Sequence, residues 1–453
     1  MSSTFTIIVF LAAIAYLMIA IAKLKIHPFF AMISACVAVG LLMRLQPTQI
    51  VSSITGGFGG ILGSLGIVFG LGALLGEMLS ESGATEVLAD SVLKIAGKKH
   101  SSLAMNIIGF IISIPVYMGT AYIILDPMNK SLAYKTKKNV IVYATALSIG
   151  LLVTHCLVIP TPGPLAVAST LGLNVGWFIL YALIVSVPAS LLGGWVWGEF
   201  LGKKYPYEVP WGFDPEQAEK NETASDENRP SAGLALAMIF LPIAIIMLGT
   251  ILGLSGAETT LGMIGNALTA SSGTLSLLIS VLVSMVCLKK YLKTPFGKMI
   301  PKVFNEQGNI LFILGAGGSF GAIVTATGIG DVLVETLSSM NISVVVLAFV
   351  LCILLRAALG SSTVALLTTA TILGPVAQEM GANMILLGLA ICCGAIGLSL
   401  PTDGGFWEVK ELDNFDYNKT TLIMTVGTTI ASIVGFLAVL LLQLGAGALP
   451  GLH

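Results

Sequence analysis

Long apolar runs dominate the chain, and short polar segments separate them. A helix needs about 20 apolar residues to cross a bilayer. Runs close to this length occupy residues 5–22, 28–45, 61–80, 139–158, 176–200, 232–254, 274–288, 308–325, 385–400 and 420–444. The pattern predicts an all-α integral membrane protein with about ten transmembrane spans.

Two further apolar segments, 102–127 and 343–375, carry polar residues and glycines at their centres. Irregular backbone at membrane depth is tolerated only where it is buried in protein or lines a cavity. Each of these segments therefore predicts a re-entrant hairpin, which enters and leaves the membrane on the same side.

The basic residues agree with this arrangement. If the N-terminus is outside and both polar-centred segments are hairpins, nearly all Lys and Arg residues fall in inside loops, and Arg44 is the exception outside. The loops at 255–273, 326–342 and 376–384 contain no Lys or Arg. The positive-inside rule then places both termini outside and the polar segment 203–230 in the cytoplasm.

Composition narrows the function classes further. Of the 453 residues, 56% are apolar and 10% are charged, and the net charge is −1. A soluble protein carries about 25% charged residues, so the lipid bilayer must cover part of this apolar surface. No basic surface indicates nucleic acid as a partner. The absence of HExxH and CxxC motifs argues against a metal site or a metal-dependent enzyme.

The sequence contains an internal repeat. GALLGEMLSESGATEVL at 72–88 aligns with GGSFGAIVTATGIGDVL at 317–333, and Glu86 falls on Asp331. Each copy continues with a polar-centred segment, and Gly119 in the first segment aligns with Gly360 in the second. Each copy then has an apolar run interrupted by VIPTPGP at 158–164 or SLPTDGG at 399–405. Glycine-rich apolar sequence can match itself by chance, but three matches in the same order argue against that.

An odd number of predicted crossings separates the two copies, so the second copy is expected to be inverted. Inverted repeats with interrupted helices are typical of transporters that bind substrate at the repeat interface. The predicted organisation is scaffold spans at 1–60, a first repeat at 61–200 with its broken helix at 139–172, and a cytoplasmic linker at 201–231. Further scaffold spans at 232–305 and a second repeat at 306–444, with its broken helix at 385–412, complete the chain.

Three motifs resemble the gluconate permease family of proton symporters. They are THCLVIPTPGPLAVA at 154–168, RAALGSSTVA at 356–365 and the DGGFW of SLPTDGGFW at 399–407. The resemblance implies an ion-transporter-superfamily-like fold, a homodimer in the bacterial cytoplasmic (inner) membrane, and uptake of sugar acids such as gluconate. The family also includes D-serine permeases. Gluconate members carry His where Thr161 stands and Asn where Thr402 stands, so the resemblance leaves the substrate open between these classes.

The interrupted helices are the candidate substrate site. Proline breaks a helix, and the half-helix that follows can present free backbone N–H groups and a positive dipole end to an anion. The candidate substrate-binding residues are Gly119, Thr120, Thr161, Gly163, Arg356, Gly360, Ser361, Ser362, Thr363, Thr402, Asp403 and Gly404. Two alternatives stay open. The hydroxyl groups can instead bond nearby helix carbonyls, and Arg356 can hold either a substrate carboxylate or Asp403.

Proton coupling requires a group that titrates within the membrane. His155 and Asp403 are the candidates, because each lies beside or within an interrupted helix. Histidine titrates near neutral pH, although His155 can also simply bond a backbone carbonyl. Sodium is a rival coupling ion, since carbonyls of unwound helices can hold Na⁺. No other cofactor is expected.

Overall fold

The computed structural model describes the whole chain except residues 1, 21–23, 25, 214–227, 257, 330–331, 333–342 and 453. Within these described residues, every regular element is a helix. The predicted all-α class is therefore confirmed. Residues 214–227 of the predicted linker at 201–231, together with the repeat residues Asp331 and Leu333, lie outside the described residues.

The helices can be divided into three groups. The first joins the N-terminal helices with helices from the middle of the chain, and each of the other two is consecutive along the chain. The first is α1 (Ser3–Met18), α2 (Pro28–Leu42), α3 (Pro47–Glu81), α12 (Ala232–Gly253), α13 (Thr260–Leu288) and α14 (Phe296–Ala326). The second is α4 (Ala84–Ala96), α5 (Ser101–Ile112), α6 (Met118–Thr136), α7 (Ile141–Leu157), α8 (Pro162–Thr170), α9 (Val175–Ser190) and α10 (Trp197–Lys204). The third is α16 (Val344–Leu359), α17 (Ser362–Glu379), α18 (Met384–Ile396), α19 (Gly404–Leu412), α20 (Tyr417–Thr420) and α21 (Gly427–Leu444).

Several helices are long and apolar enough to span a membrane. In the described part of the chain, six segments meet that criterion, and further apolar helices are shorter. The predicted span at 61–80 is only part of α3, which begins at Pro47. Pro at the first helical position and a capping box between Gln46 and Gln49 start this helix in polar sequence, before the apolar run. The count of about ten spans remains a prediction.

Both polar-centred segments fold as two helices joined by a turn. Residues 113–117 separate α5 from α6, and residues 360–361 separate α16 from α17. The second helix of the first pair, α6, continues to Thr136, beyond the predicted end at 127. Both predicted interruptions are also present, because α7 and α8 are separated by residues 158–161 and α18 and α19 by residues 397–403. The order of turn and break thus occurs twice along the chain.

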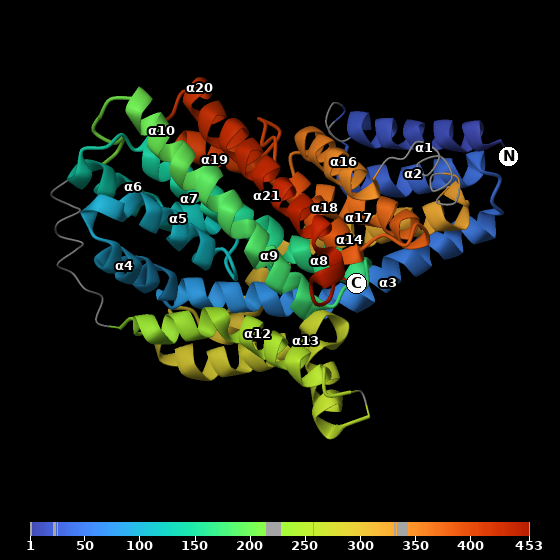
Figure 1. Cartoon of the computed structure of the whole chain (residues 1–453), viewed down its shortest axis with the longest axis horizontal. Helices are drawn as coiled ribbons and strands as arrows, with labels where there is room; N and C mark the ends of the chain where they lie inside the picture. Colours follow the sequence, from blue (N-terminus) through green and yellow to red (C-terminus); the bar gives the residue numbers. More distant parts are fainter. Residues whose placement is uncertain are drawn as a thin grey trace.

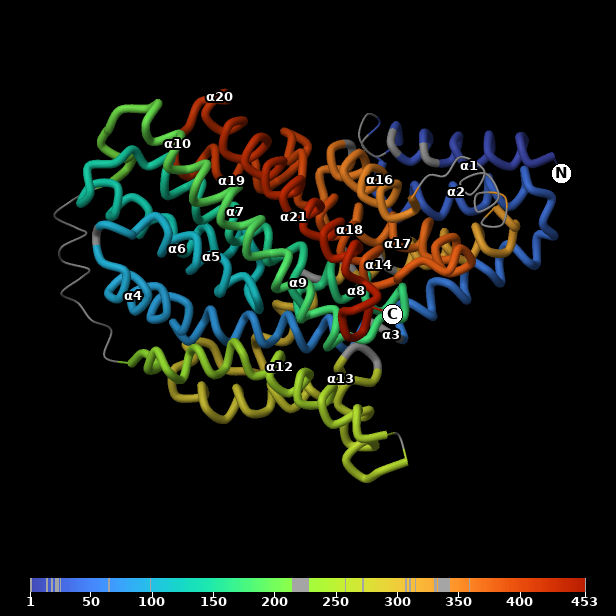
Figure 2. The backbone as a smooth tube through the Cα atoms, in the orientation of Figure 1, coloured from blue at the N-terminus to red at the C-terminus, as the bar shows by residue number. Residues whose placement is uncertain are grey.

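The broken helices lie at the centre of the molecule. Every residue of α7 is buried, and so is every residue of α18 after Met384. Figure 1 shows α3 running along the length of the protein, with α4 to α6 near one end and α14, α16 and α17 toward the other. The tube in Figure 2 shows α12 along the outer side of α3, while α9 and α21 cross the molecule obliquely. The breaks in α7–α8 and α18–α19 are therefore surrounded by protein.

Candidate functional site

A cavity of about 300 Å³ lies between α3, the turn before α6 and the break between α7 and α8. Its lining residues come from those three places, with Val303 added from α14. They are Gly72, Ala73, Gly76, Glu77, Ser80, Pro115, Val116, Tyr117, Thr120, His155, Pro160, Thr161, Pro162 and Val303. This volume suits a small organic molecule.

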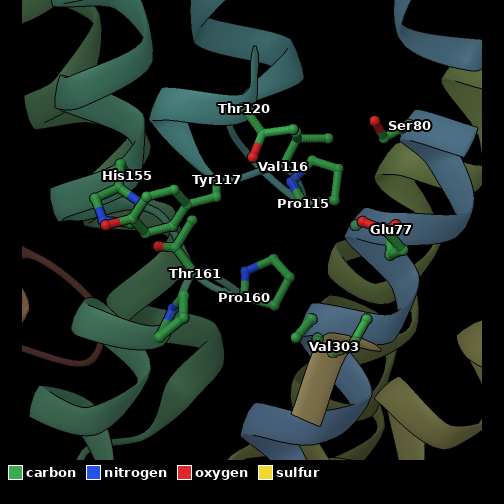
Figure 3. Close-up of a pocket in the computed structure, with 14 residues that line it drawn as sticks. Glu77, Ser80, Pro115, Val116, Tyr117, Thr120, His155, Pro160, Thr161 and Val303 are labelled. Carbon is green, nitrogen blue, oxygen red and sulfur yellow. The ribbon is translucent and has the colours of Figure 1, made fainter. Parts of the chain in front are cut away.

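His155 and Tyr117 form one wall of the cavity (Figure 3). Their rings meet edge to face with centroids 5.0 Å apart, and the Nδ1 atom of His155 is buried without a hydrogen-bond partner. Thr161 lies below them at the break, and its hydroxyl donates to the carbonyl of Val158 at 2.5 Å. This wall therefore offers a ligand one imidazole and the lone pairs of one hydroxyl group.

The opposite wall is α3, whose glycines allow close approach of the turn and the break. A Cβ atom on Gly76 would lie 2.2 Å from the carbonyl oxygen of Pro115, and one on Gly72 would lie 3.4 Å from that of Pro160. Glu77 also faces the cavity and forms an ion pair with Lys302, with Nζ and Oε1 2.6 Å apart. The repeat glycines in this helix therefore set the width of the cavity.

Arg356 is paired within the protein. It is fully buried, its Nη2 atom forms an ion pair with Asp403, and its Nε atom donates to the carbonyl of Ala395 at 3.0 Å. Ser399 also donates its hydroxyl to Asp403. Of the two roles open for Arg356, the structure shows the contact with Asp403. The Nη1 atom of Arg356 is buried without a partner.

The half-helix ends are less open than the proline pattern suggests. Asp403 already caps α19, because the N–H of Gly405 donates to its Oδ1 atom at 3.0 Å. At the start of α8, Pro162 and Pro164 have no N–H, so Gly163 supplies the one free donor in the first three positions. An anion at the first break would therefore meet one backbone donor, while the second break already holds a carboxylate.

The predicted site residues divide into two adjacent groups. Thr120, Thr161 and His155 line the cavity, with Gly119 and Gly163 next to them in the chain. The other group surrounds the second turn and break, away from the cavity lining. It comprises Arg356, Gly360, Ser361, Ser362, Thr363, Thr402, Asp403 and Gly404.

Local bonds satisfy several of the predicted hydroxyl groups. Thr402 donates to the carbonyl of Ala357 at 3.0 Å, and Ser361 caps α17 by accepting from the N–H of Val364 at 3.4 Å. The two groups are still neighbours, because a Cβ atom on Gly163 would lie 4.0 Å from the hydroxyl oxygen of Thr363. The charges of Arg356 and Asp403 also act on His155.

Sequence reasoning missed three polar residues of the cavity lining, Tyr117, Glu77 and Ser80. Tyr117 directly precedes the first turn of α6, next to the predicted Gly119 and Thr120. The signal in the sequence that could have identified Tyr117 is its position, as an aromatic residue near the centre of the polar-centred segment 102–127. Ser80 follows Glu77 by three residues on α3, and a single serine near a helix end gives no comparable signal.

The sequence matches known permeases over nearly its whole length. The profile described as "GntP family permease" matches residues 5–445. The D-serine transporter DsdX of Escherichia coli K12 is 34% identical over 443 residues, covering 96% of this chain and 97% of that protein. The gluconate permease of Pseudomonas aeruginosa PAO1 is 32% identical over 444 residues, covering 96% of each.

Solved structures of transporters share the fold. The YdaH transporter of Alcanivorax borkumensis gives a TM-score of 0.65 at 17% identity and covers 94% of this chain. MtrF of Neisseria gonorrhoeae gives a TM-score of 0.68 at 14% identity and covers 93% of this chain. The alignments include 100% and 96% of those two chains.

Proposed function

Because the chain belongs to the GntP family of permeases, we propose that it is a proton symporter that imports a small hydroxylated organic anion of the gluconate type. Membership makes the protein a membrane transporter and not an enzyme. The substrate class and the coupling ion are the proposal.

The observation that carries the proposal is the cavity between the first turn and the first break. It is small, it is enclosed by α3, and two threonine side chains, Thr120 and Thr161, reach it. These hydroxyl groups, and a backbone donor at Gly163 next to the lining residue Pro162, suit a ligand that carries both hydroxyl and carboxylate groups. A polar ligand here would replace water that otherwise solvates these groups.

His155 is our candidate for the proton-exchanging group in the cavity. Its imidazole lines the cavity with Nδ1 unpartnered, so a proton can be exchanged there with the ligand or with water. The other predicted candidate is Asp403, and both of its carboxylate oxygens already accept hydrogen bonds, from Arg356, Ser399 and the N–H of Gly405. We therefore favour His155 over Asp403.

A small hydroxylated amino acid is the second candidate substrate. The relative named as a D-serine transporter raises this possibility, and the carboxylate of Glu77 on the wall opposite His155 supports it. A ligand ammonium would share this carboxylate with Lys302. An ammonium group could approach Glu77 while the carboxylate of the same ligand approaches Gly163. A sugar acid has no ammonium group, so a contact between the ligand and Glu77 is expected only for the amino acid.

A thermal-shift screen on purified protein tests the substrate class, with sugar acids, hydroxy acids and D-amino acids as ligands. We expect one class to raise the melting temperature, and Thr161→Val to weaken that ligand about tenfold. Thr269→Val is the matched control, because Thr269 donates to Gly265 within α13, outside the cavity lining. Stabilisation only by compounds without a carboxylate would refute the proposed class. In proteoliposomes, uptake driven by an imposed sodium gradient but not by a pH gradient would refute proton symport.

A further inference from the structure

A second buried polar cluster lies where α6 passes α19. Tyr122 donates its hydroxyl to the Oδ2 atom of Asp413 at 2.6 Å. Lys130 pairs with the Oδ2 atom of Asp126 at 2.7 Å and donates to the carbonyl of Leu412 at 2.8 Å. Asp126 and Asp413 are 5% and 4% exposed. Two carboxyl groups and one ammonium group are thus enclosed together.

The remaining oxygens of the two carboxyl groups lack donors. Oδ1 of Asp126 and Oδ1 of Asp413 are both buried, and neither accepts a hydrogen bond from another group. The two carboxyl groups lie close enough for the charge of Asp126 to act on Asp413. Two ionised carboxylates repel each other when they are buried close together, so the pair favours binding one proton.

A neighbouring side chain gives independent support for a binding site. Asn129 is fully buried, and neither its Oδ1 nor its Nδ2 atom has a partner. It follows Tyr122 by seven residues and Asp126 by three, so helical spacing puts all three on one face of α6. Buried polar groups are nearly always hydrogen-bonded, and an unsatisfied amide beside an unsatisfied carboxyl pair indicates a place where a proton or water is bound.

We propose that Asp126 and Asp413 form a proton-binding site, separate from the cavity, which holds one proton between the two carboxyl groups near neutral pH. The ligand is a proton and not a metal cation, because the Lys130 ammonium already balances one carboxylate and would repel a second cation. Glu411 and Asn414 on either side of Asp413 are exposed, so the proton exchanges with water at the end of α19.

The surrounding charges agree with this assignment. Asp413 follows α19 in a segment outside the membrane-length apolar helices. Burial, and secondly the charge of Asp126, raise the pKa of Asp413 to about 8, while Tyr122 and Lys130 oppose this rise. Helices α4, α5 and α7 also pack against α6, and α20 packs against α19. Lys130 acts on both carboxyl groups. The pair is therefore poised to gain or lose a proton near neutral pH.

The site is connected to the cavity along two helices. Helix α6 has Tyr117 at its cavity end and Asp126 further along, while α19 has Asp403 at its start and Asp413 after its end. Glu408 lies between them, and a Cβ atom on Gly119 would be 2.7 Å from its carboxylate oxygens. Loss of the shared proton would leave two facing negative charges and loosen the contact between α6 and α19. This link to transport rests on the proposed proton symport.

Infrared difference spectra of the reconstituted full chain, recorded against pH, test proton binding without any transport. We expect a protonated-carboxyl band that titrates near pH 8 and is absent in Asp413→Asn, whose amide mimics the protonated acid. Glu411→Gln is the matched control on the same helix, because Glu411 has a mostly exposed side chain. This control should keep the band. A band that persists unchanged in Asp413→Asn, or no titrating band in the parent, would overturn the proposal.

Tyr122→Phe provides a second test that does not depend on removing a carboxyl group. It deletes a hydrogen bond that favours the ionised form, so the midpoint should rise by about one pH unit. An unmoved midpoint would overturn the placement of the proton. Uptake measurements separate this inference from the proposed function. A titrating pair with sodium-driven uptake would refute proton symport alone, whereas uptake driven by a pH gradient without a titrating pair would refute the carboxyl site alone.

Discussion

The buried ion pair between Arg356 and Asp403 allows a quantitative prediction of how a substitution changes the free energy of unfolding. Asp403→Asn keeps the size of the side chain and its ability to cap α19, since Asn and Asp cap helices about equally well. The substitution leaves the Arg356 guanidinium, which is 1% exposed, without its counter-charge. Removing one partner of a buried pair costs about 3–5 kcal/mol, a large part of a typical unfolding free energy.

Replacing both partners should cost much less than replacing one. In Arg356→Met with Asp403→Asn, no buried charge remains, and apolar replacement of a buried pair is often nearly neutral. The double variant should therefore regain at least half of the stability that Asp403→Asn loses. An exposed pair gives the contrast: Glu411→Gln beside Lys410 should change stability by about 0.5 kcal/mol or less.

Reversible unfolding in SDS–detergent mixed micelles measures these free energies, and substrate binding is measured on the same samples. If Asp403→Asn costs no more than Glu411→Gln, the pair does not stabilise the fold. If the double variant is as unstable as the single one, the unpaired charge is not the cause. If the double variant regains its stability but does not bind substrate, Arg356 also has a role in holding the substrate.

Three further predictions concern the second turn, the topology and the carboxyl pair. Gly360 has φ +70° and a Cβ atom there would lie 1.9 Å from the carbonyl oxygen of Thr402, whereas Gly381 has φ +63° and open space around it. Gly360→Ala should therefore lower the unfolding free energy by about 1–3 kcal/mol more than Gly381→Ala, and equal losses would contradict this reasoning. Single cysteines placed at 215–225, within the predicted cytoplasmic segment, should resist a membrane-impermeant thiol reagent in intact cells; labelling there would reverse the predicted topology. Asp413 binds its proton more tightly in the folded than in the unfolded chain, so stability should fall as pH rises from about 4 towards 8. Melting curves of the parent and Asp413→Asn across this range should differ in slope, and identical slopes would rule out this titration.

The candidate site was only partly predictable because it depends on long-range contacts. The PTPGP and PTDGG motifs located both breaks, since proline acts on its own helix. The sequence left two roles open for Arg356, because Asp403 is 47 residues away along the chain and only packing brings them together. Tyr117 and Glu77 line the same cavity because packing brings their distant segments together. The hydroxyl groups of Thr402 and Ser361 form hydrogen bonds with nearby backbone atoms, and which bonds form depends on the local geometry.

By itself, the sequence determined the helical membrane class, the two turns and the two breaks. Apolar run length, proline and glycine act locally, and bilayer thickness requires such runs whatever their neighbours. Tertiary structure alone decided which polar groups are paired. It paired Asp403 with Arg356 and left the buried Nδ1 of His155 without a hydrogen-bond partner. It also brought α6, which carries Tyr122 and Asp126, against Asp413, which lies far along the chain. Inside a membrane protein each polar group needs a partner, and the partner is set by which helices pack together.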